Sequence, residues 1–159
     1  MEENKTAEAR RVYQDLCEYL DAIGWKYDKV EKSFILRFGV KRGSVTMQCM
    51  WYVDESSRVL RLYATTNFKF SKDKLVEGAL ATSHANYRTA NGVFEYDIST
   101  GAVTFKLIQA YRGSVLSPTI FDYMLDTTVG MVDDYTALFL MLSNGMIDMP
   151  TFVKKVDEL

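Results

Sequence analysis

Apolar side chains recur every three or four residues near the start of the chain, from Ala9 to Ile23. This spacing is typical of an amphipathic helix that buries one face. Thr6 is suited to cap the beginning of such a helix, and Gly24 is suited to follow its end. We therefore predict a first helix over residues 7–23.

The period then changes to two. Apolar and polar residues alternate over residues 34–40, 45–53 and 60–64, and turn-forming residues separate these runs at 41–44 and 54–57. Alternation of this kind is typical of strands with one buried face, and short turns join antiparallel neighbours. The pattern predicts an antiparallel meander of these strands.

The second half of the chain repeats helix and strand patterns. A helix is expected over residues 72–90, a hairpin over 92–98 and 102–111, and a long helix from Ser117-Pro118 to about residue 143, with a short helix after Pro150. The inward stripe expected for the 72–90 helix is Leu75, Val76, Ala79, Leu80, Ser83, Tyr87 and Ala90. The order α-β-β-β-α-β-β-α predicts the α+β class, with helices packed on one face of an antiparallel sheet.

The composition fits one globular domain over residues 1–159, and we expect residues 1–5 and 154–159 to fray. The chain has 159 residues, 48% of them hydrophobic and 25% charged, and a net charge of −2. A slightly acidic chain argues against a nucleic-acid partner. Without a signal-like start or a membrane-spanning apolar run, a cytoplasmic protein with no membrane partner is expected. Cys17 and Cys49 are expected to be buried thiols.

Side chains that would carry catalysis are scarce. His84 is the only histidine, so a nucleophile paired with a histidine base or a zinc site has too few ligands. The segment GVKRGS at residues 39–44 lacks the pattern of a phosphate-binding loop and reads as a turn. Asp122, Asp126 and Asp133 lie opposite the apolar stripe of their helix, where solvated charges belong. We expect no catalytic residue, no metal site and no cofactor.

The outer face of the predicted sheet is less polar than a solvated face. Met50, Tyr52, Tyr63 and Ile108 share it with arginine and lysine side chains. Met and Tyr mixed with Arg suit a protein-binding surface, but a second layer formed by the tail of the chain would explain them equally well. We select these four residues as candidate protein contacts.

Two further features suggest a second copy of the chain. Around Leu140 the long helix is apolar on every side, so it is expected to be covered either by the tail or by a partner protomer. The 72–90 helix is rich in small residues, which permit close packing. Gly78, Ala81 and Ala85 are the residues that we select for a homodimer contact.

The element order and several segments resemble the YbjN-type proteins, a family of candidate bacterial sensory transduction regulators that shares the fold of class I type III secretion chaperones. The resemblance covers residues 7–143 and is carried by Asn86-Tyr87, by NGVFEYD at 91–97, TGAVTFK at 100–106, Leu116-Ser117 and VDDY at 132–135. It implies a non-catalytic, homodimeric protein that holds an extended segment of a protein client.

The expected function is therefore that of a chaperone-like adaptor or regulator, not an enzyme, with a protein client as its partner. The alternative is a regulatory domain that senses a small molecule, with its ligand between the long helix and the sheet. A third possibility is an enzyme built only from carboxylates, Tyr and Arg.

Overall fold

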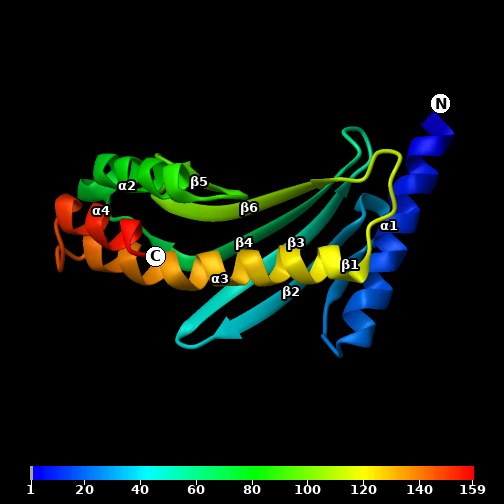
Figure 1. Cartoon of the computed structure of the whole chain (residues 1–159), viewed down its shortest axis with the longest axis horizontal. Coiled ribbons are helices and arrows are strands. Elements are labelled where there is room, and N and C mark those ends of the chain that lie inside the picture. Colours follow the sequence, from blue (N-terminus) through cyan, green and yellow to red (C-terminus); the bar gives the residue numbers. More distant parts are fainter. Residues whose placement is uncertain (1) are drawn as a thin grey trace.

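A computed structural model describes residues 2–159, with side chains from Asn4 onward. These residues form one antiparallel sheet with helices packed against one of its faces (Figure 1). The elements are α1 (Glu2–Ala22), β1 (Asp28–Val30), the 3-10 turn η1 (Glu31–Ser33), β2 (Ile35–Arg42), β3 (Val45–Asp54), β4 (Val59–Lys69), the 3-10 turn η2 (Lys72–Lys74), α2 (Leu75–Arg88), β5 (Val93–Asp97), β6 (Ala102–Ala110), α3 (Pro118–Ser143) and α4 (Met149–Asp157).

The strands follow the order β1-β2-β3-β4-β6-β5, and each neighbouring pair is antiparallel. The α+β class and the helices on one face are confirmed. The short β1 was not predicted. It pairs only with Ile35–Arg37 at the beginning of β2, so no strand among the described residues borders the rest of β2 on that side. A register shift in the β4–β6 pairing, between Thr65 and Lys69, was also not predicted.

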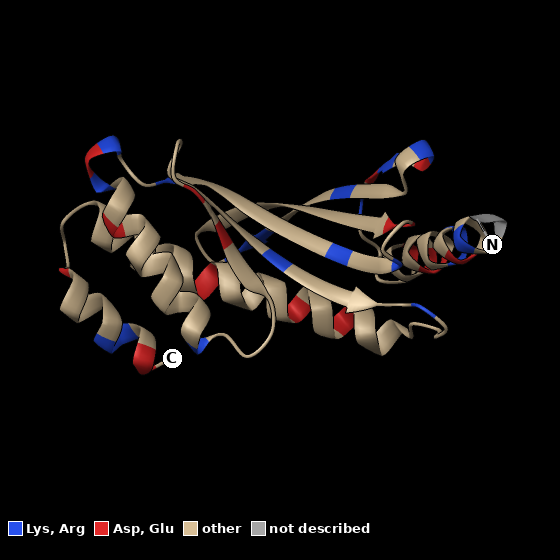
Figure 2. Cartoon of the chain, turned by 90° about the horizontal axis from the view of Figure 1, so that it is seen from above, with Lys and Arg blue, Asp and Glu red and all other residues tan. Residues whose placement is uncertain are grey.

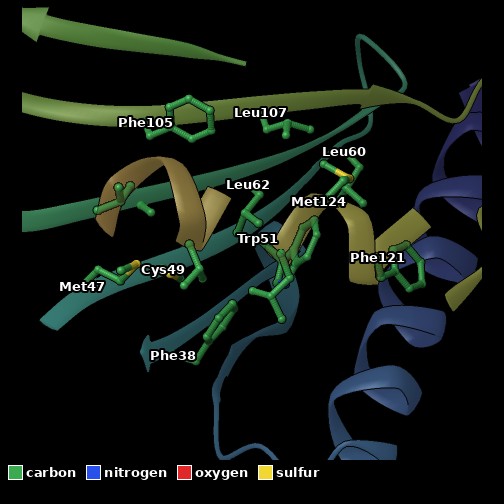
Figure 3. Close-up of a cluster of buried hydrophobic side chains, with 14 of the residues drawn as sticks. Phe38, Met47, Cys49, Trp51, Leu60, Leu62, Phe105, Leu107, Phe121 and Met124 are labelled. Carbon is green, nitrogen blue, oxygen red and sulfur yellow. The ribbon is translucent and has the colours of Figure 1, made fainter. Parts of the chain in front are cut away.

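The core lies between the sheet and α3, which runs along the length of the sheet (Figure 1). Figure 3 shows Trp51 of β3 beside Phe121 of α3, and their ring centroids are 6.2 Å apart. Met124 and Leu62 are fully buried in the same layer. Each large apolar side chain buried here contributes about 1.5–3 kcal/mol. The alternation predicted for β2, β3 and β4 is confirmed.

The tail does not cover the outer face of the sheet. It forms α4, and the ring of Phe152 stacks on Phe139 of α3 at a centroid distance of 5.7 Å. Val156 is also buried, and α4 continues to Asp157, so the helix extends into the residues for which fraying is predicted. Cover by the tail is partial, because Leu140 keeps 46% of its surface exposed.

Helix α2 is rotated relative to the prediction. Val76, Leu80 and Tyr87 were expected inside, but they are 70%, 59% and 82% exposed. The buried side consists of Gly78, Ala81, Thr82 and Ala85. The reason is steric, because a Cβ atom at Gly78 would come within 2.7 Å of the Phe70 ring. Gly78, Ala81 and Ala85 therefore pack inside their own chain and are not available for the homodimer contact predicted for them.

Helix α1 begins earlier than expected. It starts at Glu2, and Thr6 lies inside it and donates a hydrogen bond to the Glu55 carboxylate in the turn after β3. The predicted N-cap at Thr6 is therefore wrong, because the helix already includes this residue, and residue 1 lies outside the described residues. The buried stripe of α1 agrees with the prediction from Ala9 to Leu20.

Asn86 of α2 fixes the edge strand β5. Its side-chain nitrogen donates to the carbonyl of Phe94 at 2.9 Å, and its oxygen accepts from the N–H of Phe94 at 2.7 Å. The amide thus occupies both backbone groups with which this residue would bind another strand. This gives a physical role to the asparagine that precedes the hairpin in the resemblance described above.

Replacing Gly101 with alanine will destabilise the protein strongly. Gly101 has φ +75°, and a Cβ atom there would overlap the backbone of Phe70. We expect the free energy of unfolding to fall by about 3 kcal/mol or more, measured by urea denaturation. The control is Gly113→Ala, which has φ +68° but open space around it, and should cost only about 1–2 kcal/mol. Equal losses in both variants would contradict the steric argument.

The two cysteines will differ in reactivity. Burial raises the pKa of the Cys49 thiol to about 12, and it also raises the pKa of Cys17, which is only half-buried. Since the thiolate is the reactive form, iodoacetamide at pH 8 should modify Cys17 in the native protein and Cys49 only after unfolding, as read by mass spectrometry. Labelling of both cysteines at one rate would show that β3 opens readily.

Candidate protein-binding surface

The outer face of the sheet is open. Side chains alternate between the two faces of each strand, and the helices cover only the face that carries Leu36, Trp51 and Leu62. The strand register then aligns the outward residues in rows across the sheet. One row is Ile35, Tyr52, Arg61 and Ile108, and the next is Arg37, Met50, Tyr63, Lys106 and Val93. The choice left open by the sequence, between an open face and one covered by the tail, is thus resolved as open.

The four predicted contact residues lie together in these two rows. Met50 and Tyr63 are direct register partners, and Tyr52 follows Met50 on the same face of β3. Ile108 lies one strand beyond Arg61 and is 43% exposed. The structure therefore groups the four residues on one face of the sheet. Their role in binding stays a prediction.

Arg61 is held in place between two partners within the first row. Its Nη2 atom lies 2.6 Å from Oδ2 of Asp54, and its guanidinium carbon lies 5.7 Å from the centre of the Tyr52 ring. Burial by itself would raise the pKa of Asp54, but hydrogen bonds from Ser57 and Ser56 and the charge of Arg61 outweigh it and lower the pKa. The carboxylate stays ionised at neutral pH and fixes the arginine beside the tyrosine ring.

A shallow hollow lies on the outer face. Its volume is about 320 Å³, and it is lined by Arg37, Gln48, Cys49, Met50, Tyr63, Thr65 and Thr104. Met50 and Tyr63 contribute apolar surface, whereas Gln48, Thr65 and Thr104 contribute hydrogen-bonding groups. Such a surface can accept an apolar side chain and bind the polar backbone next to it.

A larger hollow, of about 560 Å³, adjoins this face at Tyr52 and was not predicted. It lies between the beginning of α1, η1 and the turn after β3, and Lys5, Lys32 and Glu55 contribute charges of both signs. It depends on Phe34, which has φ 52° and turns the chain sharply between η1 and β2. A left-handed phenylalanine gives no pattern in the sequence, because glycine and asparagine are the residues expected there.

The described residues hold no cluster of metal-ligand side chains, and the layer between α3 and the sheet has little free space. They contain no group of three or more His, Cys, Asp or Glu side chains that could hold a metal ion. His84 instead contacts Asp157 of α4, with Nε2 3.2 Å from Oδ1. Between α3 and the strands, the hollow that Phe94, Phe105 and Phe139 line measures only about 10 Å³. The small-molecule alternative placed its ligand in this layer, and the hollow is too small for a metabolite.

Charges are distributed unevenly over the elements. Figure 2 shows basic residues spread over several strands, whereas α3 carries acidic residues and neither Lys nor Arg. Asp122 of α3 accepts a hydrogen bond of 2.6 Å from the Tyr19 hydroxyl. Asp133 lies 3.3 Å from Nε of Arg42 at the end of β2. Some acidic groups of α3 therefore hold neighbouring elements in place. No helix in the described part of the chain has the length and apolar character needed to cross a membrane.

Comparison with known proteins identifies the fold. No protein-family model and no curated protein matches the sequence. Among solved structures, a chain of the ExsC–ExsE complex matches with a TM-score of 0.60 and 15% identity over 81% of this chain and 93% of that chain. YbjN from E. coli, a candidate transcription regulator, matches with a TM-score of 0.58 and 8% identity over 84% and 92%.

A chain of the HopA1–SchA chaperone–effector complex also matches, with a TM-score of 0.50 and 12% identity over 79% of this chain and 93% of that chain. At such identities the likeness concerns the fold and not the function. The prediction made from the sequence is confirmed at this level. The chain has the fold shared by YbjN and the type III secretion chaperones.

Proposed function

We propose that this protein is a non-catalytic, chaperone-like adaptor or regulator that binds a protein client on the outer face of its sheet. The observation that carries the proposal is the open cluster of Met50, Tyr52, Tyr63 and Ile108, which none of the described helices covers. Apolar and aromatic side chains beside arginine are typical of the centre of protein interfaces. The neighbours described above as complexes with protein partners support the same role.

The arrangement suits binding more than catalysis. Arg61 and Tyr52 are fixed in contact with each other, and the methionine beside them has a flexible side chain that adapts to different partners. A client needs no deep cavity on such a face, because alternate side chains of an extended segment can rest on the rows of the sheet. The unpaired Cys17 and Cys49 fit a reducing compartment, so we place the protein in the cytoplasm.

We also propose that the protein acts as a homodimer, through the outward side of α2. Val76, Leu80 and Tyr87 expose large apolar surfaces along this helix. Single exposed apolar residues are ordinary, but three on one helix are typical of an interface. A twofold axis would bring the same side of α2 from each protomer together, as closed dimers require. The side differs from the one predicted from the sequence, but the helix is the same.

A double substitution tests the client surface. Met50→Glu with Tyr52→Glu places two charges in the apolar cluster while leaving the buried face of β3 intact. Tagged wild-type protein should retain a specific, stoichiometric protein from the lysate of its source organism. The double variant should lose that protein and keep its circular dichroism spectrum, because unpaired carboxylates oppose burial against a client. Val115→Glu, at an exposed apolar site before α3, is the control and should retain the client. If the double variant retains it equally, the surface is wrong.

The dimer is tested by mass. Wild-type protein should have the mass of a dimer in light scattering after size-exclusion chromatography. Leu80→Glu should yield a folded monomer, because two buried carboxylates would face each other across the twofold axis. Val115→Glu again serves as the control and should remain dimeric. A wild-type monomer, or a dimer that survives Leu80→Glu, would contradict the role of α2.

A further inference from the structure

Of the three cations in the two rows described above, the chain itself neutralises two. Arg61 pairs with Asp54 at 2.6 Å, and Lys106 pairs with Glu95. Arg37 lies in the same row as Lys106 but forms no ion pair with any described residue. Its guanidinium is exposed and retains its capacity to bind an anion.

Arg37 lies where two hollows meet. The hollow on the outer face, described above, measures about 320 Å³. The second lies at the edge of the sheet, where β1 ends, and measures about 330 Å³. Its lining consists of Lys26, Tyr27, Asp28, Arg37, Phe38, Gly39 and Gln48. Arg37 and Gln48 belong to both linings, so the two hollows adjoin at these residues, and we call the pair of hollows the trough.

Gly39 keeps this trough open. It lies inside β2, where glycine weakens a strand, and its φ is not positive, so the backbone does not require it. A Cβ atom there would meet only Gln48 Nε2 at 3.7 Å and the Met47 carbonyl at 4.0 Å, which are ordinary contacts. The fold would accept a side chain at this position. Glycine inside a strand often marks a place where another chain approaches closely.

The spacing of the row limits what can bind. Neighbouring strands are about 4.8 Å apart, so the point between Met50 and Tyr63 lies about 7 Å from Arg37. In an extended segment, side chains two residues apart point the same way at a distance of about 6.6–6.8 Å. A segment that crosses the strands can therefore place one side chain between Met50 and Tyr63 and the next one on that side at Arg37.

We infer that the trough binds an extended segment of a protein client in which an apolar residue and an Asp or Glu are two positions apart. The apolar side chain rests on Met50 and Tyr63, and the carboxylate accepts paired hydrogen bonds from the Arg37 guanidinium. Lys26, at the edge of the sheet, adds to the positive charge of the trough. Asp28 opposes it and is the register partner of Arg37 on β1, but it forms no ion pair with Arg37. This inference rests on the proposed function and gives the chemical class of the client segment.

The test is a selection from a random peptide display library on immobilised full-length protein. Wild-type protein should enrich peptides with an apolar residue two positions from Asp or Glu, and Arg37→Gln should remove the acidic preference. The best enriched peptide, made synthetically, should bind Arg37→Gln about tenfold more weakly in fluorescence anisotropy, as expected for one lost charged pair. Gly39→Val should also weaken binding, because its side chain would fill the trough. Lys41→Gln, an exposed change on the same strand, should bind as wild type does.

The outcomes separate this inference from the proposed function. Peptides that are enriched without an acidic residue, or that bind Arg37→Gln unchanged, overturn the inference and leave the binding surface in place. If wild-type protein enriches nothing beyond what the Met50→Glu, Tyr52→Glu variant enriches, both are wrong. If Gly39→Val converts a wild-type oligomer to a smaller species in light scattering, the trough is filled by a second copy, and the inference is overturned.

Discussion

The burial of one face of the sheet beneath α3 is the contact on which the rest of the molecule depends. α3 reaches from Phe121, beside Trp51 and the ring of Tyr19, to Phe139, beside Phe94 and Phe152. The helices at both ends of the molecule thus bind to the same long helix. Each depends on that contact, because most of the stability of a helix in a protein comes from the packing of its apolar face.

The same constraint explains why the other face is bare. The helices form a single layer, and the short α4 is used at the end of α3, where Phe152 completes an aromatic cluster. No described element remains to cover Met50 and Tyr63. The chain limits the cost of this exposure by mixing the apolar residues with charged side chains, of which Arg61 is paired with Asp54. Only a few apolar side chains distinguish this face from an ordinary solvent-exposed sheet face.

Much of the fold followed from local patterns. Helix α3 begins and ends where the sequence predicts, because Ser117-Pro118 and Asn144-Gly145 give clear start and stop signals. β1 was missed since three residues are too few to show a period. α2 was placed with the wrong side inward, because hydrophobicity favours burial of Leu80 over Gly78, whereas the distance to Phe70 decides. That distance is known only from the three-dimensional structure.

The candidate site was predictable in part, because strand alternation is visible in the sequence. Period-two alternation places Met50, Tyr52, Tyr63 and Ile108 on one face, and register then brings them into adjacent rows. The pairing of Arg61 with Asp54 and the isolation of Arg37 depend on side-chain positions across strands. The hollow beside η1 depends on the left-handed conformation of Phe34, which no sequence pattern predicts.

The amide of Asn86 also determines how the sheet can assemble. A fibre grows edge to edge only if each molecule offers both edges, one to the copy before it and one to the copy after it. At β5 the backbone of Phe94 is already occupied by Asn86, while the far part of β2 borders no strand. A strand that adds at β5 would have to displace this amide, whereas one that adds at the far part of β2 would not. The half-buried carboxamide of Asn86 thus opposes open-ended polymerisation through the β5 edge.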